Sequence, residues 1–243
     1  MPDRIYTERK EASVTQTELD GLVVNIELTL ISIIQAVALT FLVDHSFDVI
    51  VGLQFSLWPY VVTGLLIILA FWSRSLIHTL TVIRWPLDLG HNFMYIACTL
   101  VEAVTFTQLR DPLHWYALNA LFGLMILALL AFDLRMIRHR ISDSAGPMGS
   151  ELYAIVEREQ CLNIRFIMPA TVVFNLLAMM ATWVWAAPLI EENGHVIIGL
   201  VQLALALGYL IYVLRFFVRI APLIAKTRQE WRDDVLAQEA KVK

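Results

Sequence analysis

The hydrophobic positions of this chain fall into six long runs, which are separated by shorter polar stretches. The runs occupy roughly residues 22–43, 56–77, 91–109, 113–134, 165–188 and 195–217. A helix needs about 20 apolar residues to cross the roughly 30 Å hydrocarbon core of a bilayer. The pattern therefore predicts an all-α, polytopic membrane protein with six transmembrane helices. The run at 91–109 is the most polar, since it includes His91, Asn92 and Glu102.

The positive residues predict how these helices are oriented. Of the 18 Lys and Arg residues, 17 fall in alternate segments: before the first run, around the second loop, around the fourth loop and from Arg215 onward. The other loops hold only Arg110. Because loops rich in Lys and Arg stay in the cytoplasm, both termini are predicted to be cytoplasmic. We expect the host membrane to be a bacterial inner membrane.

On this basis the chain divides into five segments. They are a cytoplasmic N-terminal segment (1–21), a four-helix membrane unit (22–134), a cytoplasmic loop (135–164), a two-helix membrane hairpin (165–217) and a charged, helical cytoplasmic tail (218–243). The loop is predicted to contain a short amphipathic helix, over 151–164, that lies along the membrane or docks under the bundle. Asp133 is expected only to mark the cytoplasmic end of the fourth helix, where it pairs with Arg135 or Arg138.

The composition agrees with a membrane location and argues against several classes of function. The chain is 58% hydrophobic and 16% charged, with a mean hydropathy of +0.67, whereas soluble domains are about 25% charged. Cys98 and Cys161 have no partner at a motif spacing, so neither a disulfide nor a Cys-based metal site is predicted. The sequence has no glycine-rich nucleotide-binding loop. It also has no recognisable motif that pairs a catalytic nucleophile with a general base. We therefore expect no enzymatic activity, no cofactor and no nucleic-acid partner.

Polar and small residues follow one face of the first helix. At about 100° per residue they fall within a stripe about 80° wide. This polar stripe consists of Asn25, Thr29, Ser32, Ala36 and Thr40. One interpretation is a pore wall of hydroxyls and amides, with Ile33 or Leu39 as hydrophobic constrictions. The other is a helix-packing seam, because small and hydroxyl residues are common where membrane helices approach closely.

Other polar residues inside the predicted membrane helices each call for a partner or a water-lined wall. We expect five of these intramembrane polar residues to support the pore-lining helix. They are Gln35, His78, Asn92, Glu102 and Asn119. Glu102 is the most deeply placed acid. It is either a proton or cation site, or a neutral carboxyl group hydrogen-bonded to a neighbouring helix.

Two histidines, His78 and His91, are predicted to lie at the same side of the membrane. Two His residues at matching depth on facing helices are the requirement for bis-His haem ligation. The simpler interpretation is a hydrogen bond at the membrane interface. Without a His-rich loop or a Cys pair, no metal site is predicted.

Three short patterns between residues 24 and 135 bear on the family. The first helix contains AVALTFLV (36–43), the second ends with Trp72 and His78 ahead of Asp88 and Asn92, and the fourth opens with WYALNALFG, which includes Tyr116 and Asn119. Together they resemble a family of six-span potassium channels, the endolysosomal potassium channel and its bacterial relatives. The resemblance implies an oligomer, a tetramer in the bacterial members, with the first helix of each chain lining the pore.

One departure from that family falls on the pore helix itself. The family's Phe-Ser-Asp signature would fall on Leu30, Ile31 and Ser32, and its Arg on Ile26, so the signature is absent. Since selectivity in such pores depends on the first helix, potassium selectivity is the implied property that this departure affects most.

These observations lead to two hypotheses about function. The first is a homo-oligomeric channel for a monovalent cation such as potassium, with the first helix lining the path and the bilayer as its surroundings. The second is an accessory or scaffold subunit of a membrane complex, which binds partners through loop 135–164 and the C-terminal tail. A third option, a haem-bearing electron-transfer subunit, predicts a Soret band in the purified protein.

Overall fold

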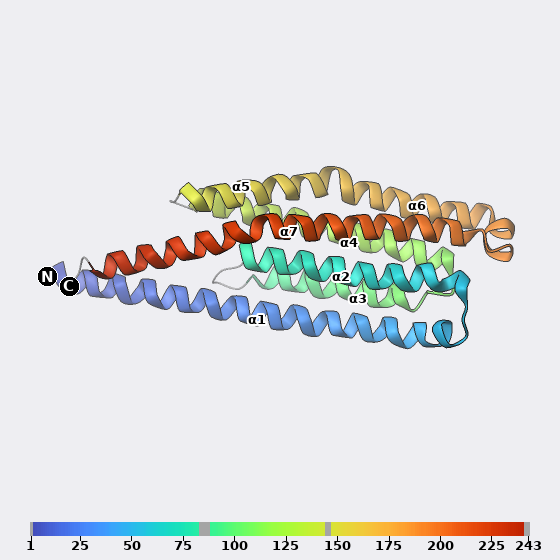
Figure 1. The fold of residues 1–243 in the computed structure, drawn as a ribbon, viewed down its shortest axis with the longest axis horizontal. Helices are drawn as coiled ribbons and strands as arrows, with labels where there is room; N and C mark the ends of the chain where they lie inside the picture. The colour runs from blue at the N-terminus through green and yellow to red at the C-terminus, as the bar shows by residue number, and fades with distance from the viewer. Residues whose placement is uncertain (1, 83–87, 144–146, 241–243) are drawn as a thin grey trace.

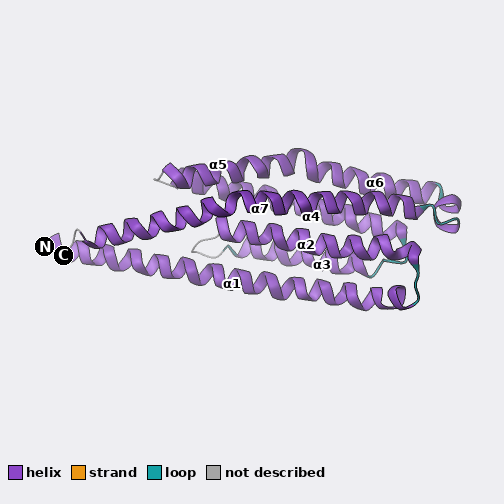
Figure 2. Cartoon of the chain, viewed as in Figure 1, coloured by secondary structure: helices purple, strands orange, loops and turns teal. Residues whose placement is uncertain are grey.

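The computed structural model describes the backbone of residues 2–82, 88–143 and 147–240, and side chains within 19–82, 88–139, 151–227 and 229, apart from residue 20. Every regular element in this part of the chain is helical (Figure 2). The long helices are α1 (Pro2–Val51), α2 (Trp58–Thr81), α3 (Leu89–Phe106), α4 (Pro112–Asp143), α5 (Pro147–Leu162), α6 (Met168–Val184) and α7 (His195–Ala240). Short turns of other helical types occupy Phe55–Leu57, Asn163–Ile167 and Ala187–Glu191.

The helices form one elongated bundle in which successive helices run in opposite directions, except that α5 continues into α6 in the same direction (Figure 1). α1 packs against α2 and α3, α4 packs against α3 and α6, and α2 packs against α7. α1 begins and α7 ends at the same end of the bundle, here called the termini end. The turns at 52–57, 107–111 and 185–194 lie at the opposite end, here called the far end.

Five helical stretches are long and apolar enough to cross a membrane. They are Gly21–Val51, Phe55–Thr81, Pro112–His139, Glu151–Val184 and His195–Thr227. This is the pattern of an integral membrane protein. α3 is not among these stretches, and it is the short helix that carries His91, Asn92 and Glu102. The sixth span therefore stays a prediction, as does the orientation of the termini.

The segment predicted as a cytoplasmic loop looks different in the structure. The helix expected over 151–164 is present as part of α5, but it continues without a break through the turn Asn163–Ile167 into α6. Its inner face is covered by the bundle, with Leu152, Tyr153 and Val156 buried. This part of the expected loop is therefore structurally part of the helical bundle. Residues 144–146 of the same loop lie outside the described part of the chain.

The core consists of three layers of apolar side chains along the bundle. The far-end layer holds Tyr60, Phe106, Trp115 and Tyr116; the middle layer holds Ile31, Phe71, Tyr95 and Ile126; the layer nearest the termini end holds Ile77, Ile137, Val213 and Ile220. In lipid, contacts of this kind stabilise a bundle through close packing rather than through removal of apolar surface from water. Polar side chains between these layers must therefore satisfy one another.

Gly64 marks a close approach of α2 to its neighbours, and its replacement gives a first prediction. A Cβ atom at Gly64 would lie 2.9 Å from Leu42 Cδ1 on α1 and 3.1 Å from the Phe106 ring on α3. We expect Gly64→Leu to lower the melting temperature in mild detergent, since overpacking a core costs about 1–3 kcal/mol. The matched control is Gly208→Leu on α7, where nothing lies within 4 Å of the added Cβ atom. Equal melting temperatures for the two variants would contradict the packing described here.

Candidate functional site

The polar stripe of α1 lies on the outer surface of the bundle. Asn25, Thr29, Ser32, Ala36 and Thr40 are all exposed, as are the expected constriction residues Ile33 and Leu39. The opposite face of α1 is the one that packs against α2 and α3, and it buries Glu27 and Gln35. A path lined by the stripe would therefore run between copies of the chain, not inside one protomer.

The hydroxyl groups of the stripe are hydrogen-bonded within α1 itself. Thr29 donates to the Asn25 carbonyl at 2.9 Å, and Ser32 donates to the Leu28 carbonyl at 2.8 Å. Thr40 makes the same bond to the Ala36 carbonyl, also at 2.8 Å. Bonds of this kind satisfy each O–H donor without water or a second chain. The stripe is therefore suited to either of the two interpretations, a packing seam or a wall.

On the inner face of α1, Gln35 meets Glu102 of α3. The Gln35 amide nitrogen lies 3.1 Å from the Tyr95 hydroxyl, 3.4 Å from Thr99 Oγ1 and 3.4 Å from Glu102 Oε2. Both Gln35 and Glu102 are buried. Glu102 thus has a hydrogen-bonding partner on a neighbouring helix. This agrees with the interpretation of Glu102 as a neutral, hydrogen-bonded carboxyl group. Asn119 on α4 donates to the Trp115 carbonyl at 2.9 Å.

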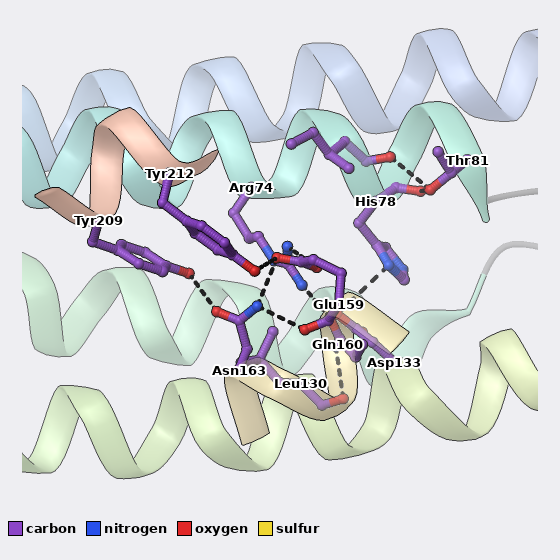
Figure 3. Close-up of polar contacts among 11 residues, drawn as sticks. Arg74, His78, Thr81, Leu130, Asp133, Glu159, Gln160, Asn163, Tyr209 and Tyr212 are labelled. Carbon is purple, nitrogen blue, oxygen red and sulfur yellow. Dashed lines mark hydrogen bonds and ion pairs between the residues drawn. The ribbon is translucent and has the colours of Figure 1, made fainter. Parts of the chain in front are cut away.

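A network of charged and polar groups centres on Arg74 of α2 (Figure 3). Its guanidinium group donates to the Glu159 carboxylate and to the Gln160 side-chain oxygen, both on α5. Gln160 in turn donates to the Leu130 carbonyl on α4 at 2.8 Å. The Arg74 and Glu159 side chains are only 12% and 5% exposed. The pair therefore ties α2 to α5 inside the bundle, where each charge depends on the other.

The rest of this Arg74 cluster comes from the π-helical turn between α5 and α6 and from α7. Asn163 donates to the Glu159 carbonyl at 2.9 Å and to Glu159 Oε1 at 2.6 Å, and it accepts a bond from the Tyr209 hydroxyl at 3.2 Å. The Tyr212 hydroxyl donates to Glu159 Oε1 at 3.2 Å (Figure 3). Isolated π turns are frequent at functional sites. Here the turn holds Asn163 against the buried carboxylate.

A second cluster joins His78, His91 and Asp133, one residue each from α2, α3 and α4. We call it the His–Asp cluster. His91 Nδ1 lies 2.9 Å from Asp133 Oδ1, and His78 Nδ1 lies 3.6 Å from Asp133 Oδ2. All three residues are buried. The expectation that Asp133 pairs with Arg135 or Arg138 is therefore wrong, because Asp133 faces inward while Arg138 pairs with Glu157 on the surface.

The two histidine rings do not have the arrangement that bis-His haem ligation needs. They stack on each other with centroids 4.8 Å apart and an interplanar angle of 21°. Two imidazoles that ligate one haem lie on opposite sides of the macrocycle, and this stacking leaves no space for one between them. The hydrogen bond of His91 to Asp133 agrees with the simpler interpretation of this pair.

Two cavities lie beside these clusters, and Arg74 lines both. The larger, of about 130 Å³, is lined by residues of α2, α4, α6 and α7. Its wall is mainly apolar, with Arg74 and Tyr209 toward the termini end and Asn175 and Gln202 toward the far end. The smaller, of about 30 Å³, is bordered by the His–Asp cluster together with Arg74, Glu159 and Gln160.

Further polar groups close the bundle toward the far end. Trp115 donates to Gln202 at 2.8 Å, and Gln202 donates to Asn175 at 2.9 Å. Tyr60 shares hydrogen bonds with the Tyr116 hydroxyl at 3.2 Å and with His195 Nδ1 at 3.0 Å. These bonds connect α2, α4, α6 and α7, so the larger cavity is bounded by polar contacts at both ends.

Reasoning from the sequence found part of this arrangement and missed part. It singled out His78, Gln35, Asn92 and Glu102, all of which are buried and bonded or stacked in the bundle. It placed Glu159, Gln160 and Asn163 in a cytoplasmic loop, and it gave Arg74 no role beyond orientation. A spacing signal was present, because Arg74 and His78 are four residues apart, as are Glu159 and Asn163, which puts each pair on one face of a helix.

Comparison with known proteins gives no match to this chain: no protein-family model, no curated protein and no solved structure is similar to it. The resemblance to a potassium channel family therefore stays a prediction, and function has to be argued from the geometry.

Proposed function

We propose that this integral membrane protein assembles with copies of itself into a cation channel in which α1 of each copy faces a shared path. The observation that carries the proposal is the outward position of the polar stripe along the membrane-crossing part of α1. A row of hydroxyls and a terminal amide facing lipid tails would contribute nothing to folding. Facing a path or a neighbouring copy, the same residues provide lone pairs and close packing.

The interior of the protomer supports a path outside it. Two sets of buried charged groups are paired within the bundle, since Arg74 pairs with Glu159 and Asp133 with the two histidines. The larger cavity has an apolar wall and is bounded at one end by Arg74. Apolar walls and paired charges do not replace the hydration shell of an ion. We therefore assign the conducting surface to α1. We expect the permeant ion to be a monovalent cation, and potassium is the first ion to test.

A flux measurement on the reconstituted protein tests this. We expect wild-type protein in liposomes to pass potassium, and Ser32→Phe to reduce the flux by about tenfold or more, because a large apolar ring in a narrow path excludes water. The matched control is Ile197→Phe, which adds a ring on the exposed surface of α7. It should leave the flux unchanged. Thr40→Cys should also form a disulfide between copies if α1 lies near the axis of the oligomer.

Two outcomes would contradict the channel. One is wild-type protein that carries no cation flux and stays monomeric in lipid, which would favour the accessory subunit. Its expected binding surfaces are loop 135–164 and the tail, of which residues 140–150, 228 and 230–243 have side chains outside the described part of the chain. The other is equal loss of flux in Ser32→Phe and Ile197→Phe, which would place the effect in folding rather than in a path.

A further inference from the structure

We propose that His78, His91 and Asp133 form a binding site for a divalent first-row transition-metal ion, with Zn²⁺ as the first probe. The inference is independent of the channel, because it concerns the inner face of the four-helix unit and not the stripe on α1. It also departs from the sequence, which predicted no metal site. The sequence did not predict this site because its three residues come from three different helices, and His91 and Asp133 are 42 residues apart.

The distances within the cluster are close to those of a metal site. Each residue offers one ligand atom, and these atoms all lie within 4.8 Å of one another. Two ligands about 2.05 Å from a tetrahedral ion are separated by about 3.3 Å. The two His–Asp distances, 2.9 and 3.6 Å, fall on either side of that value. The two distances involve different oxygens of Asp133, so the carboxylate faces one imidazole with each oxygen, and side-chain shifts would bring one ligand atom of each residue to one ion.

Two further observations at the cluster point to an occupant. His78 Nε2, the ring nitrogen other than the Nδ1 that faces Asp133, is buried and has no hydrogen-bonding partner among the described residues. Buried polar atoms are rarely left unpaired, so such an atom calls for an explanation, and an ion or water is the usual one. The adjoining cavity of about 30 Å³ is lined by all three residues. It has room for one water-sized occupant.

The donor set favours a particular class of ion. Two imidazole nitrogens and a carboxylate oxygen suit Zn²⁺, Co²⁺ and Fe²⁺, whereas Mg²⁺ and Ca²⁺ prefer oxygen ligands alone. Glu27 of α1 lies near the site but outside the three-residue group: it is buried, hydrogen-bonds Asn92 and lies within electrostatic reach of His91. Of the three ligands, Asp133 brings the negative charge that a divalent cation requires.

Neighbouring charges do not oppose an ion here. The nearest described cation is Arg74, which borders the same cavity. Its charge is balanced by Glu159, and the Asp133 carboxylate lies in electrostatic reach of Arg74 and of both histidines. The three ligands also lie on regular helices, which hold them in place before the ion binds. Because a bound ion stabilises only the folded state, it would link α2, α3 and α4 and raise the melting temperature.

The test uses the full chain in mild detergent, without an affinity tag that contains histidine. After treatment with a chelator, Zn²⁺ is added and the bound metal is measured by mass spectrometry; we expect one ion per chain. His78→Gln and His91→Gln should weaken binding by about 100-fold or more, since losing even a hydrogen-bond partner of a ligand typically costs about 10–100-fold. The matched control is His114→Gln, which removes an exposed His–Asp pair of 2.6 Å and should bind like the wild type.

A measurement on the wild type alone keeps the inference testable if these variants fold poorly. Co²⁺ added in place of Zn²⁺ should give the visible absorption of a four-coordinate site, and X-ray absorption should show two imidazole ligands. Absence of stoichiometric Zn²⁺ binding, a metal coordinated only by oxygen, or unchanged affinity in folded His78→Gln would each overturn the site.

Discussion

Replacing Arg74 with methionine should be among the most destabilising single substitutions in this protein. We expect the free energy of unfolding to fall by about 3–5 kcal/mol, the range seen when one partner of a buried ion pair is removed. The physical cause is the group left behind. Glu159 would keep its bonds to Asn163 and Tyr212, but it would lose its only described cation inside the bundle.

Two further variants separate this effect from a general loss of packing. The double variant Arg74→Met with Glu159→Met removes both charges, and it should recover much of the stability, because apolar residues of similar volume often replace a buried pair at little cost. Arg138→Met makes the same substitution in an exposed pair, where Arg138 lies 2.8 Å from Glu157. That variant should change stability by about 1 kcal/mol or less.

Unfolding by a denaturing detergent, followed by tryptophan fluorescence, measures all three proteins. The ordering carries the prediction: Arg74→Met lowest, the double variant intermediate, Arg138→Met near the wild type. If the double variant were as unstable as Arg74→Met, the loss would come from the space that the guanidinium group fills and not from an unpaired charge.

The helices of this protein can be predicted from its sequence because each depends on one contiguous run of residues. Runs of about 20 apolar residues need no knowledge of distant parts of the chain, so five of the six expected runs coincide with helices able to cross a membrane. α3 corresponds to the most polar of the six runs. Its His91, Asn92 and Glu102 lower its hydropathy, and these polar residues are accommodated because α1 and α4 cover them.

The interior pairs were harder to predict, because each depends on residues far apart in the chain. Glu159 and Gln160 look like surface residues of an amphipathic helix until Arg74, 85 and 86 residues earlier, is placed beside them. Asp133 looked like a helix end near Arg135 and Arg138 for the same reason. Local periodicity shows which residues share a face, but not which helix that face will meet.

The same limitation applies to α1. Periodicity grouped Asn25, Thr29 and Ser32 on one face of α1, and in the structure these three are exposed while Glu27 is buried. It did not indicate which of the two faces the bundle. Glu27 and Gln35 are drawn inward because partners for them lie on α3, namely Asn92 and Glu102. The hydroxyls of the stripe can stay outside because α1 satisfies them itself.

The far end of the bundle should be as sensitive to substitution as the Arg74 cluster, for a different reason. Trp115 is fully buried at the centre of the far-end layer and contacts the Tyr60 ring edge-on, with centroids 5.4 Å apart. We expect Trp115→Ala to lower the free energy of unfolding by about 3–5 kcal/mol, the usual cost of removing a large aromatic side chain from a core. The matched control is Trp183→Ala on α6, where the ring is 73% exposed. That variant should differ little from the wild type.

A third variant, Trp115→Phe, divides the effect of Trp115 into packing and hydrogen bonding. Phenylalanine keeps an aromatic ring but loses the N–H that donates to Gln202 at 2.8 Å. Gln202 would then retain only its bond to Asn175, and an unpaired buried acceptor costs about 1–3 kcal/mol. We therefore expect Trp115→Phe to fall between the wild type and Trp115→Ala in detergent unfolding. If Trp115→Phe lowered the free energy of unfolding as much as Trp115→Ala, the hydrogen bond to Gln202 would matter more than the volume of the ring. If Trp183→Ala lowered it equally, the packing described for the far end would be wrong.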